Sequence, residues 1–188
     1  MIQDIESALN GRLGKKDIDK VVEWTSHNPS NREKLLKLAF CDNVNVNSNA
    51  LWCMTHLQKS NSQWLQSLQD FFIDSLLNEK VTSRKRMLLQ LLRTLDYPAE
   101  DIRVDFLDFC MSKINSETEP YAIRCFSLYL AIKMCRHYPD LLSELKERIS
   151  LLSREPLSPG LRCAIRKVQK EIQLLSKHPH DKAFEQKW

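Results

Sequence analysis

The residues best suited to bind a charged or polar ligand fall into four groups along the chain. Each group begins with a tryptophan or an arginine and continues at the spacing of three or four residues that places side chains on one face of a helix. The candidate binding residues are Trp52 and His56; Arg86, Gln90 and Arg93; Arg124, whose helix face continues at Ser127 and Ala131; and Arg162, Arg166 and Gln169. Arginine donates charge-assisted hydrogen bonds to carboxylates and phosphates, and glutamine bonds to backbone groups, so the pattern predicts a basic, polar binding groove.

The arginines in these groups have a second interpretation. An arginine near the start of a helix can pair with an acid of the preceding turn or repeat, while its aliphatic stem covers apolar neighbours. In that case the groups would form an internal ladder of ion pairs and not a binding surface. The sequence fits both interpretations.

No catalytic residue is predicted. The chain has only three glycines, which excludes a glycine-rich phosphate loop, and it has no serine in a nucleophile elbow. Asp101, Asp105 and Asp108 follow helical spacing, but carboxylates that act as acid and base need different environments within a cleft. We interpret these aspartates as the solvated face of a helix, so the sequence favours a non-catalytic protein over an enzyme.

No metal ion or cofactor is expected either. The six cysteines lie in apolar segments and form no Cys-x-x-Cys pair, so they fit core thiols in a reducing, cytoplasmic environment. His178 and His180 flank a proline in the C-terminal tail, which favours a mobile segment over a metal site. No segment approaches the roughly 20 apolar residues that span a membrane, so no membrane association is expected.

Helices must position the candidate binding residues. The scarcity of glycine and the apolar periodicity predict an all-α protein. A capping box at Ser30 and Glu33 predicts one helix start. Further starts are predicted near Asn47, Asn61, Thr82, Pro98, Pro120, Pro139 and Pro159. Two weaker amphipathic segments before residue 28 predict an N-terminal helical cap.

The predicted helices repeat in pairs. The second helix of a pair is apolar around most of its circumference, as in residues 122–134, so it lies between neighbours and leaves a thin polar stripe for solvent. The residues that follow the first member of each group, Cys53, Met87, Cys125 and Cys163, lie 34, 38 and 38 residues apart. This spacing is typical of stacked helical hairpins, which would place the four stripes along a concave surface.

With this spacing, the chain between residues 30 and 176 resembles the HEAT and armadillo α-solenoid superfamily. The resemblance rests on the paired helices and on an arginine near the second-helix start, as at Arg86, Arg124 and Arg162. It implies a right-handed α-α superhelix of about four hairpins. The predicted organisation is an N-terminal helical cap, repeats and a C-terminal tail within a single structural domain. Their residues are 1–28, 29–176 and 177–188.

The resemblance also implies a function. Members of this superfamily mostly act as scaffolds, which implies a non-catalytic module that binds an acidic or extended segment of a partner protein. One branch, the bacterial alkylpurine glycosylases, binds damaged DNA in its concave groove, so nucleic-acid backbone binding related to alkylation repair is the alternative. Those glycosylases use a groove aspartate flanked by aromatic residues, whereas the four groups contain Trp52 but no aspartate. A net charge of +4 is modest for a duplex-binding domain.

Overall fold

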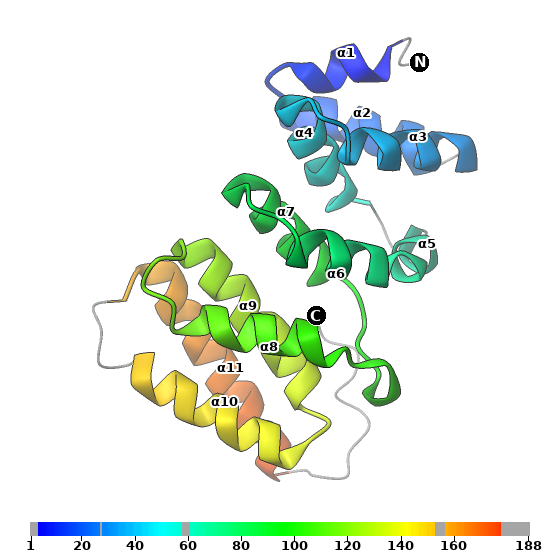
Figure 1. Cartoon of the computed structure of the whole chain (residues 1–188). Coiled ribbons are helices and arrows are strands. Elements are labelled where there is room, and N and C mark those ends of the chain that lie inside the picture. Colours follow the sequence, from blue (N-terminus) through cyan, green and yellow to red (C-terminus); the bar gives the residue numbers. More distant parts are fainter. Residues whose placement is uncertain (1–3, 27, 58–60, 153–156, 178–188) are drawn as a thin grey trace. The chain divides into compact units, whose positions relative to one another are not determined.

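The structure is a computed structural model that describes residues 4–26, 28–57, 61–152 and 157–177. Within these ranges the chain forms eleven α-helices and a short 3-10 helix and has no strand, which confirms the predicted all-α class (Figure 1). The chain divides into two compact units, residues 1–95 and residues 96–188. The predicted C-terminal tail beyond Lys177, with His178 and His180, lies outside the described residues.

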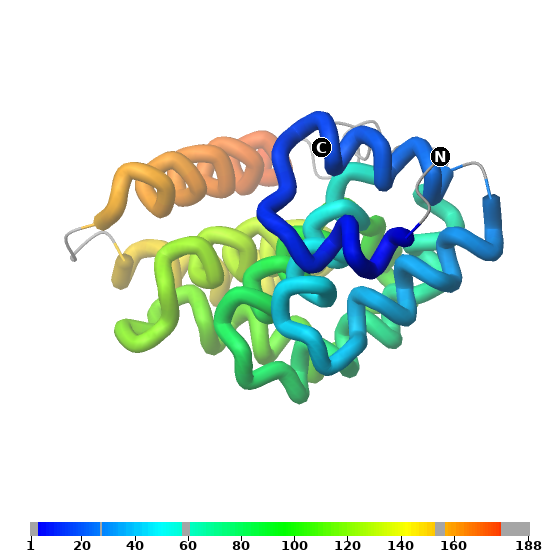
Figure 2. Tube along the Cα trace, turned by 90° about the horizontal axis from the view of Figure 1, so that it is seen from above, coloured from blue at the N-terminus to red at the C-terminus, as the bar shows by residue number. Residues whose placement is uncertain are grey.

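The first unit is arranged around two helical hairpins. Its described helices are α1 (Ile5–Asn10), α2 (Lys15–Ser26), α3 (Pro29–Ala39), α4 (Val44–Met54), α5 (Ser62–Ser67), α6 (Gln69–Leu77) and α7 (Thr82–Leu92). α3 and α4 pack as one antiparallel hairpin, α6 and α7 pack as the next, and α4 packs against α7 (Figures 1 and 2). α2 packs on α3 and α1 packs on α4. The two N-terminal helices therefore cover the first hairpin.

The second unit is built around α9. Its elements are η2 (Ala99–Asp101), α8 (Val104–Ile114), α9 (Tyr121–Cys135), α10 (Pro139–Leu152) and α11 (Pro159–Lys177). α9 packs against α8, α10 and α11. Ten of its 15 residues are buried, because neighbouring helices cover it on several sides. This burial agrees with the apolar circumference predicted for a second helix.

Each unit has its own apolar core, to which every hairpin helix contributes. Fully buried side chains that represent these helices are Leu35, Leu51, Phe72 and Leu88 in the first unit and Phe106, Leu128, Leu145 and Leu161 in the second. Full burial of one such side chain is favourable by about 1.5–3 kcal/mol. These contacts fix the rotation of each helix and therefore decide which polar faces reach solvent.

The first helix of the first hairpin begins earlier than predicted. Asn28 is its N-cap: the side-chain oxygen of Asn28 accepts a hydrogen bond from the amide of Ser30 at 2.9 Å, and Pro29 occupies the first turn. The predicted capping box of Ser30 and Glu33 is therefore wrong. Asparagine followed by proline is the stronger start signal here, since the proline costs no helical hydrogen bond.

The second helix of that hairpin also begins earlier, at Val44 and not near Asn47. Asn43 caps it, because its side-chain oxygen accepts a hydrogen bond from the amide of Asn45 at 3.0 Å. Asn47 is buried inside the helix and donates a hydrogen bond from Nδ2 to the carbonyl oxygen of Cys41 at 3.0 Å. Since asparagine suits caps and turns alike, the sequence placed this start one turn too late.

The helix predicted to begin at Pro98 begins later than predicted. Pro98 is followed only by the 3-10 turn of η2, and α8 begins at Val104. Asp101 therefore belongs to η2 and Asp105 to α8, so the predicted row of aspartates does not lie on one continuous helix. The remaining predicted starts agree with the structure, in which helices begin at Ser62, Thr82, Tyr121, Pro139 and Pro159.

Candidate binding surface

The solvent-facing side of α11 is the strongest candidate binding surface. α11 starts at Pro159, and the Oγ atom of Ser158 accepts a hydrogen bond from the amide of Leu161 at 3.3 Å, which caps the first turn. The buried residues of the helix are Leu161, Ala164, Ile165, Val168 and Ile172. Because α9 packs against α11, this apolar face is enclosed and the opposite face remains exposed.

Three predicted binding residues, Arg162, Arg166 and Gln169, lie on this exposed face of α11. Lys167 and Lys170 are exposed on the same helix. Among the residues that the structure describes, neither arginine side chain makes a hydrogen bond or an ion pair. Their guanidinium groups can therefore bind a ligand without first breaking an internal contact with the described part of the chain.

The single acid of α11 does not neutralise these arginines. Glu171 is partly buried, and burial, which disfavours the charged carboxylate, raises its pKa. The charges of Arg136 and Lys133 oppose this shift, so Glu171 interacts with the C-terminal end of α9. The exposed face of α11 consequently carries only basic and neutral side chains.

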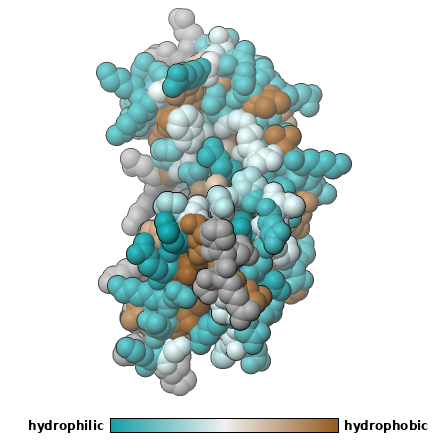
Figure 3. Space-filling view, turned by 90° about the vertical axis from the view of Figure 1, so that its left-hand side faces the viewer, coloured by the Kyte–Doolittle hydropathy of each residue, from teal (hydrophilic) through white to brown (hydrophobic). Residues whose placement is uncertain are grey.

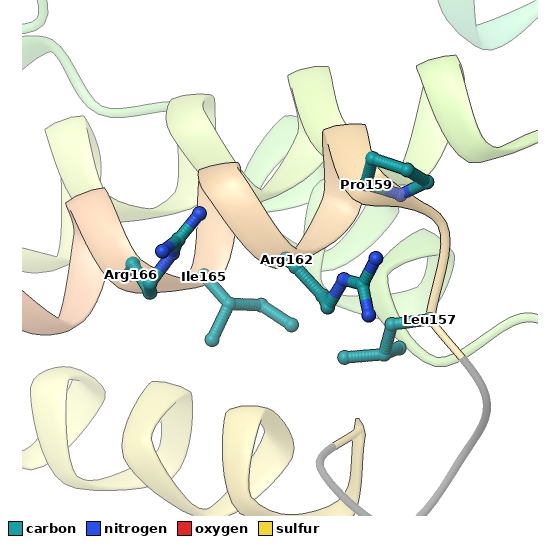
Figure 4. A pocket seen from close by; sticks show the side chains of 5 residues that line it. All are labelled: Leu157, Pro159, Arg162, Ile165 and Arg166. Atoms are coloured by element: carbon teal, nitrogen blue, oxygen red, sulfur yellow. The ribbon is translucent and has the colours of Figure 1, made fainter.

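Arg162 and Arg166 border an open pocket of about 470 Å³, whose other lining residues are Leu157, Pro159 and Ile165. Ile165 lies between the two arginines, and Leu157 lies next to Arg162 (Figure 4). The pocket thus joins apolar lining to two cationic side chains. Such a combination can hold an apolar group beside a carboxylate or a phosphate.

Arg124 does not belong to a binding surface, which corrects the predicted row. The residue is 4% exposed, and its Nε atom donates a hydrogen bond to the carbonyl oxygen of Ile114 at 3.0 Å. Its guanidinium carbon also lies 5.8 Å from the centre of the Tyr121 ring. Ser127 and Ala131, on the same stripe of α9, are fully buried. In this repeat the stripe is therefore internal, and its arginine binds a backbone carbonyl group instead of a ligand.

In the first unit, the structure brings Trp52 of α4 and His56, which follows the end of α4, close to Gln90 of α7. The Nδ1 atom of His56 lies 3.0 Å from the carbonyl oxygen of Trp52, and the two rings meet edge to face with their centres 6.1 Å apart. Gln90 donates from Nε2 to the Oγ1 atom of Thr55 at 3.5 Å. His56 is exposed, whereas Trp52 and Gln90 are partly buried. Internal hydrogen bonds therefore already occupy part of this predicted site.

The two predicted arginines of α7 are both exposed. The side chain of Arg86 makes no ion pair or hydrogen bond with the described residues, whereas Arg93 does interact with another group. Their neighbour Arg84 forms an ion pair with Glu79 at 2.9 Å, just before α7 begins. Arg84 therefore makes a structural contact, although it lies in the same basic segment, residues 84–86, as Arg86.

The sequence analysis missed the apolar part of the α11 pocket. Leu157 precedes the helix and Ile165 has the phase of a core residue, so neither attracted attention as a binding residue. The sequence did contain a signal for Leu157. A residue directly before a helix N-cap, here Ser158, packs near the first turn, and the polar stripe begins in that turn at Arg162. Searching the residues before each arginine stripe would have found it.

A smaller pocket of about 260 Å³ lies between α8 and α10. Its lining residues are Leu107, Asp108, Met111, Ser112, Leu141, Glu144 and Arg148. The Nη2 atom of Arg148 pairs with Glu144 at 2.8 Å, and Nη1 donates to the carbonyl oxygen of Met111 at 3.3 Å. Arg148 therefore holds α10 against α8, which makes this pocket part of the packing between the two helices.

All six cysteines are free. Cys53, Cys110 and Cys135 are buried, as expected for core thiols, but Cys163 is exposed on α11, where the prediction is wrong. Across the described ranges, no group of histidine, cysteine, aspartate and glutamate residues could hold a metal ion. In the same ranges, no helix has the length and apolar character needed to cross a membrane.

Comparison with known proteins identifies the family. A family model described as a HEAT repeat domain matches residues 5–172 of the chain. The match begins at α1, so it includes the two helices of the predicted N-terminal cap and reaches into both units. No curated protein and no solved structure gives a significant match. Since the model covers most of its length, the chain belongs to the HEAT repeat domain family.

Proposed function

We propose that this HEAT repeat protein is a non-catalytic binding module and that the exposed face of α11 binds an acidic, extended segment of a partner protein. HEAT repeats are commonly protein-interaction scaffolds, which supports the general class. The observation that carries the proposal is the pair Arg162 and Arg166. Both side chains are exposed beside an open pocket, and neither has a partner among the described residues.

Carboxylates are the ligands that this surface suits best. Hydrogen bonds from a guanidinium to a carboxylate are charge-assisted and can be bidentate. A single exposed ion pair contributes only about 0.2–1 kcal/mol, so binding requires several contacts together. Lys167 and Lys170 extend the positive charge along α11 and would speed association with an acidic partner.

The other predicted binding residues have different places in the proposal. Gln169 follows the arginines on α11 and would donate hydrogen bonds to the backbone of the bound segment. The first unit carries a separate set of proposed contacts: Trp52, His56, Arg86, Gln90 and Arg93. Arg124 is left out, since its guanidinium is buried.

The proposal can be tested with labelled peptides of about 12 residues that differ only in having glutamate or glutamine at alternate positions. Fluorescence anisotropy at near-physiological salt compares the wild-type protein with the double variant Arg162→Glu and Arg166→Glu. The matched control reverses the charges of Lys15 and Lys16, which are exposed on α2. We expect only the glutamate peptide to bind the wild-type protein. The double variant should bind it at least about tenfold more weakly, because two attractive charges are replaced by two repulsive ones. Equal binding by both variants would disprove the site.

Nucleic-acid backbone binding is the second candidate, because all the basic residues of α11 are exposed. They are Arg162, Arg166, Lys167, Lys170 and Lys177. A single-stranded and a duplex oligonucleotide, titrated at low and near-physiological salt, test this alternative. It predicts an affinity that falls steeply with salt and depends on the same two arginines. The absence of measurable binding at near-physiological salt would rule out nucleic-acid binding.

A further inference from the structure

The α11 pocket contains more apolar lining than a site for carboxylates alone requires. Leu157 is half-buried, and Ile165, although 6% exposed, forms the lining between the two arginines (Figure 4). In Figure 3 the surface of the second unit, in the lower half of the view, shows hydrophobic side chains among hydrophilic ones. A purely acidic ligand would leave this apolar lining in contact with water, which an apolar side chain would displace favourably.

The spacing of the arginines restricts the shape of the ligand. Arg162 and Arg166 are four residues apart on an α-helix, which corresponds to a rise of about 6 Å. In an extended chain, residues two positions apart point to the same side and lie about 6.6 Å apart. Two acidic residues separated by one other residue therefore match the two guanidinium groups.

The position of the apolar lining adds a third requirement. Leu157 lies next to Arg162, at the start of α11 (Figure 4). The next side chain on the same face of an extended ligand, two positions beyond the carboxylate that meets Arg162, would reach this lining. An aliphatic side chain at that position would be covered by Leu157.

We propose that the α11 pocket recognises an extended segment in which an aliphatic residue and two acidic residues occupy alternate positions. This inference rests on the proposed function, since it names the partner chemistry of the same surface. The two carboxylates bind Arg162 and Arg166, on either side of Ile165, and the aliphatic side chain lies against Leu157. Charge complementarity supports an acidic occupant, because the exposed face of α11 carries no acid.

A set of short peptides tests the pattern. The first peptide carries leucine, aspartate, aspartate and leucine at alternate positions separated by serines, so it presents the same pattern in either chain direction. The second has serine in place of both leucines. The third has one additional serine between the aspartates, which turns one carboxylate to the opposite side. Anisotropy measures binding of each labelled peptide to the full chain at near-physiological salt.

We expect the first peptide to bind at least about tenfold more tightly than the second, because it buries most of one leucine side chain. The third peptide should bind about two- to fivefold more weakly than the first, because it loses one exposed ion pair. In the variant Leu157→Ser, the first and second peptides should bind equally. Leu151→Ser, which changes a 51% exposed leucine of α10, is the matched control and should preserve the difference. Circular dichroism checks that each variant is folded.

The possible results separate the two proposals. If the first two peptides bind wild type equally, and both lose binding in the Arg162→Glu and Arg166→Glu variant, the apolar anchor is wrong while the acidic surface stands. If no acidic peptide binds, both proposals fail. If a single-stranded oligonucleotide binds through the same arginines and the peptides do not, a protein segment is the wrong occupant.

Discussion

The Nε atom of Arg124 donates a hydrogen bond of 3.0 Å to the backbone carbonyl oxygen of Ile114. Ile114 is the last residue of α8, and Arg124 lies in the first turn of α9. The last carbonyl groups of a helix have no partner within the helix and carry partial negative charge, so a cation is favourable there. Arg124 therefore fastens the connection between two packed helices.

Replacing Arg124 with alanine should lower the free energy of unfolding by about 1.5–3 kcal/mol, because the buried carbonyl loses a charged donor. Urea unfolding followed by circular dichroism measures the change. Arg162→Ala removes the arginine at the equivalent position of the next repeat, where the side chain is exposed, and should change stability by less than about 0.5 kcal/mol. Similar losses in the two variants would contradict the structural role of Arg124.

Arg124 and Arg162 also show what the sequence can and cannot predict. Both follow the same helix phase, which correctly places them at second-helix starts. Their exposure depends on the number of neighbouring helices: α9 packs against α8, α10 and α11, whereas α11 packs mainly against α9. That difference arises from tertiary packing, which periodicity does not encode. Helix starts had the same limitation, since local preference could not decide between Asn43 and Asn47 as the cap.

A second prediction concerns Asn49, which attaches the N-terminal helix α1 to α4. Its Nδ2 atom donates to the carbonyl oxygens of Leu9 at 2.8 Å and Gly11 at 2.9 Å. Asn49→Ala should expose these carbonyl groups and raise hydrogen–deuterium exchange of the α1 amides about tenfold, the effect of losing roughly 1.4 kcal/mol of local stability. Mass spectrometry of the N-terminal peptide measures the exchange. Asn45→Ala, at an exposed position, should leave it unchanged; an equal rise would contradict the role of Asn49.

Thiol labelling provides a third prediction. Burial raises the pKa of Cys53 and of Cys135 to about 12, so at pH 8 almost none of either thiol is in the reactive thiolate form. Cys163 is exposed and should be modified in the folded protein much faster than these two. Iodoacetamide labelling with mass spectrometry identifies the order, and Cys163→Ser should remove that fast modification. Rapid labelling of Cys53 without unfolding would contradict the structure.

The last prediction concerns Glu171 and the pH dependence of stability. Burial raises the pKa of Glu171 in the folded state, although Arg136 and Lys133 oppose the shift. In the unfolded chain a glutamate titrates near pH 4.3, approximately, so above that pH the folded state binds more protons than the unfolded state. The contribution of Glu171 is therefore favourable at low pH and is lost as the pH rises through its folded pKa.

Glu171→Gln removes this titration and keeps the shape of the side chain. The variant should match wild type near pH 4 and become more stable than wild type as the pH rises to 7, because wild type must then bury a charged carboxylate. Urea unfolding at a series of pH values measures the difference, and Glu147→Gln, on the exposed side of α10, gives the baseline. If the variant instead loses stability relative to wild type with rising pH, attraction to Arg136 and Lys133 outweighs burial, and the raised pKa of Glu171 is wrong.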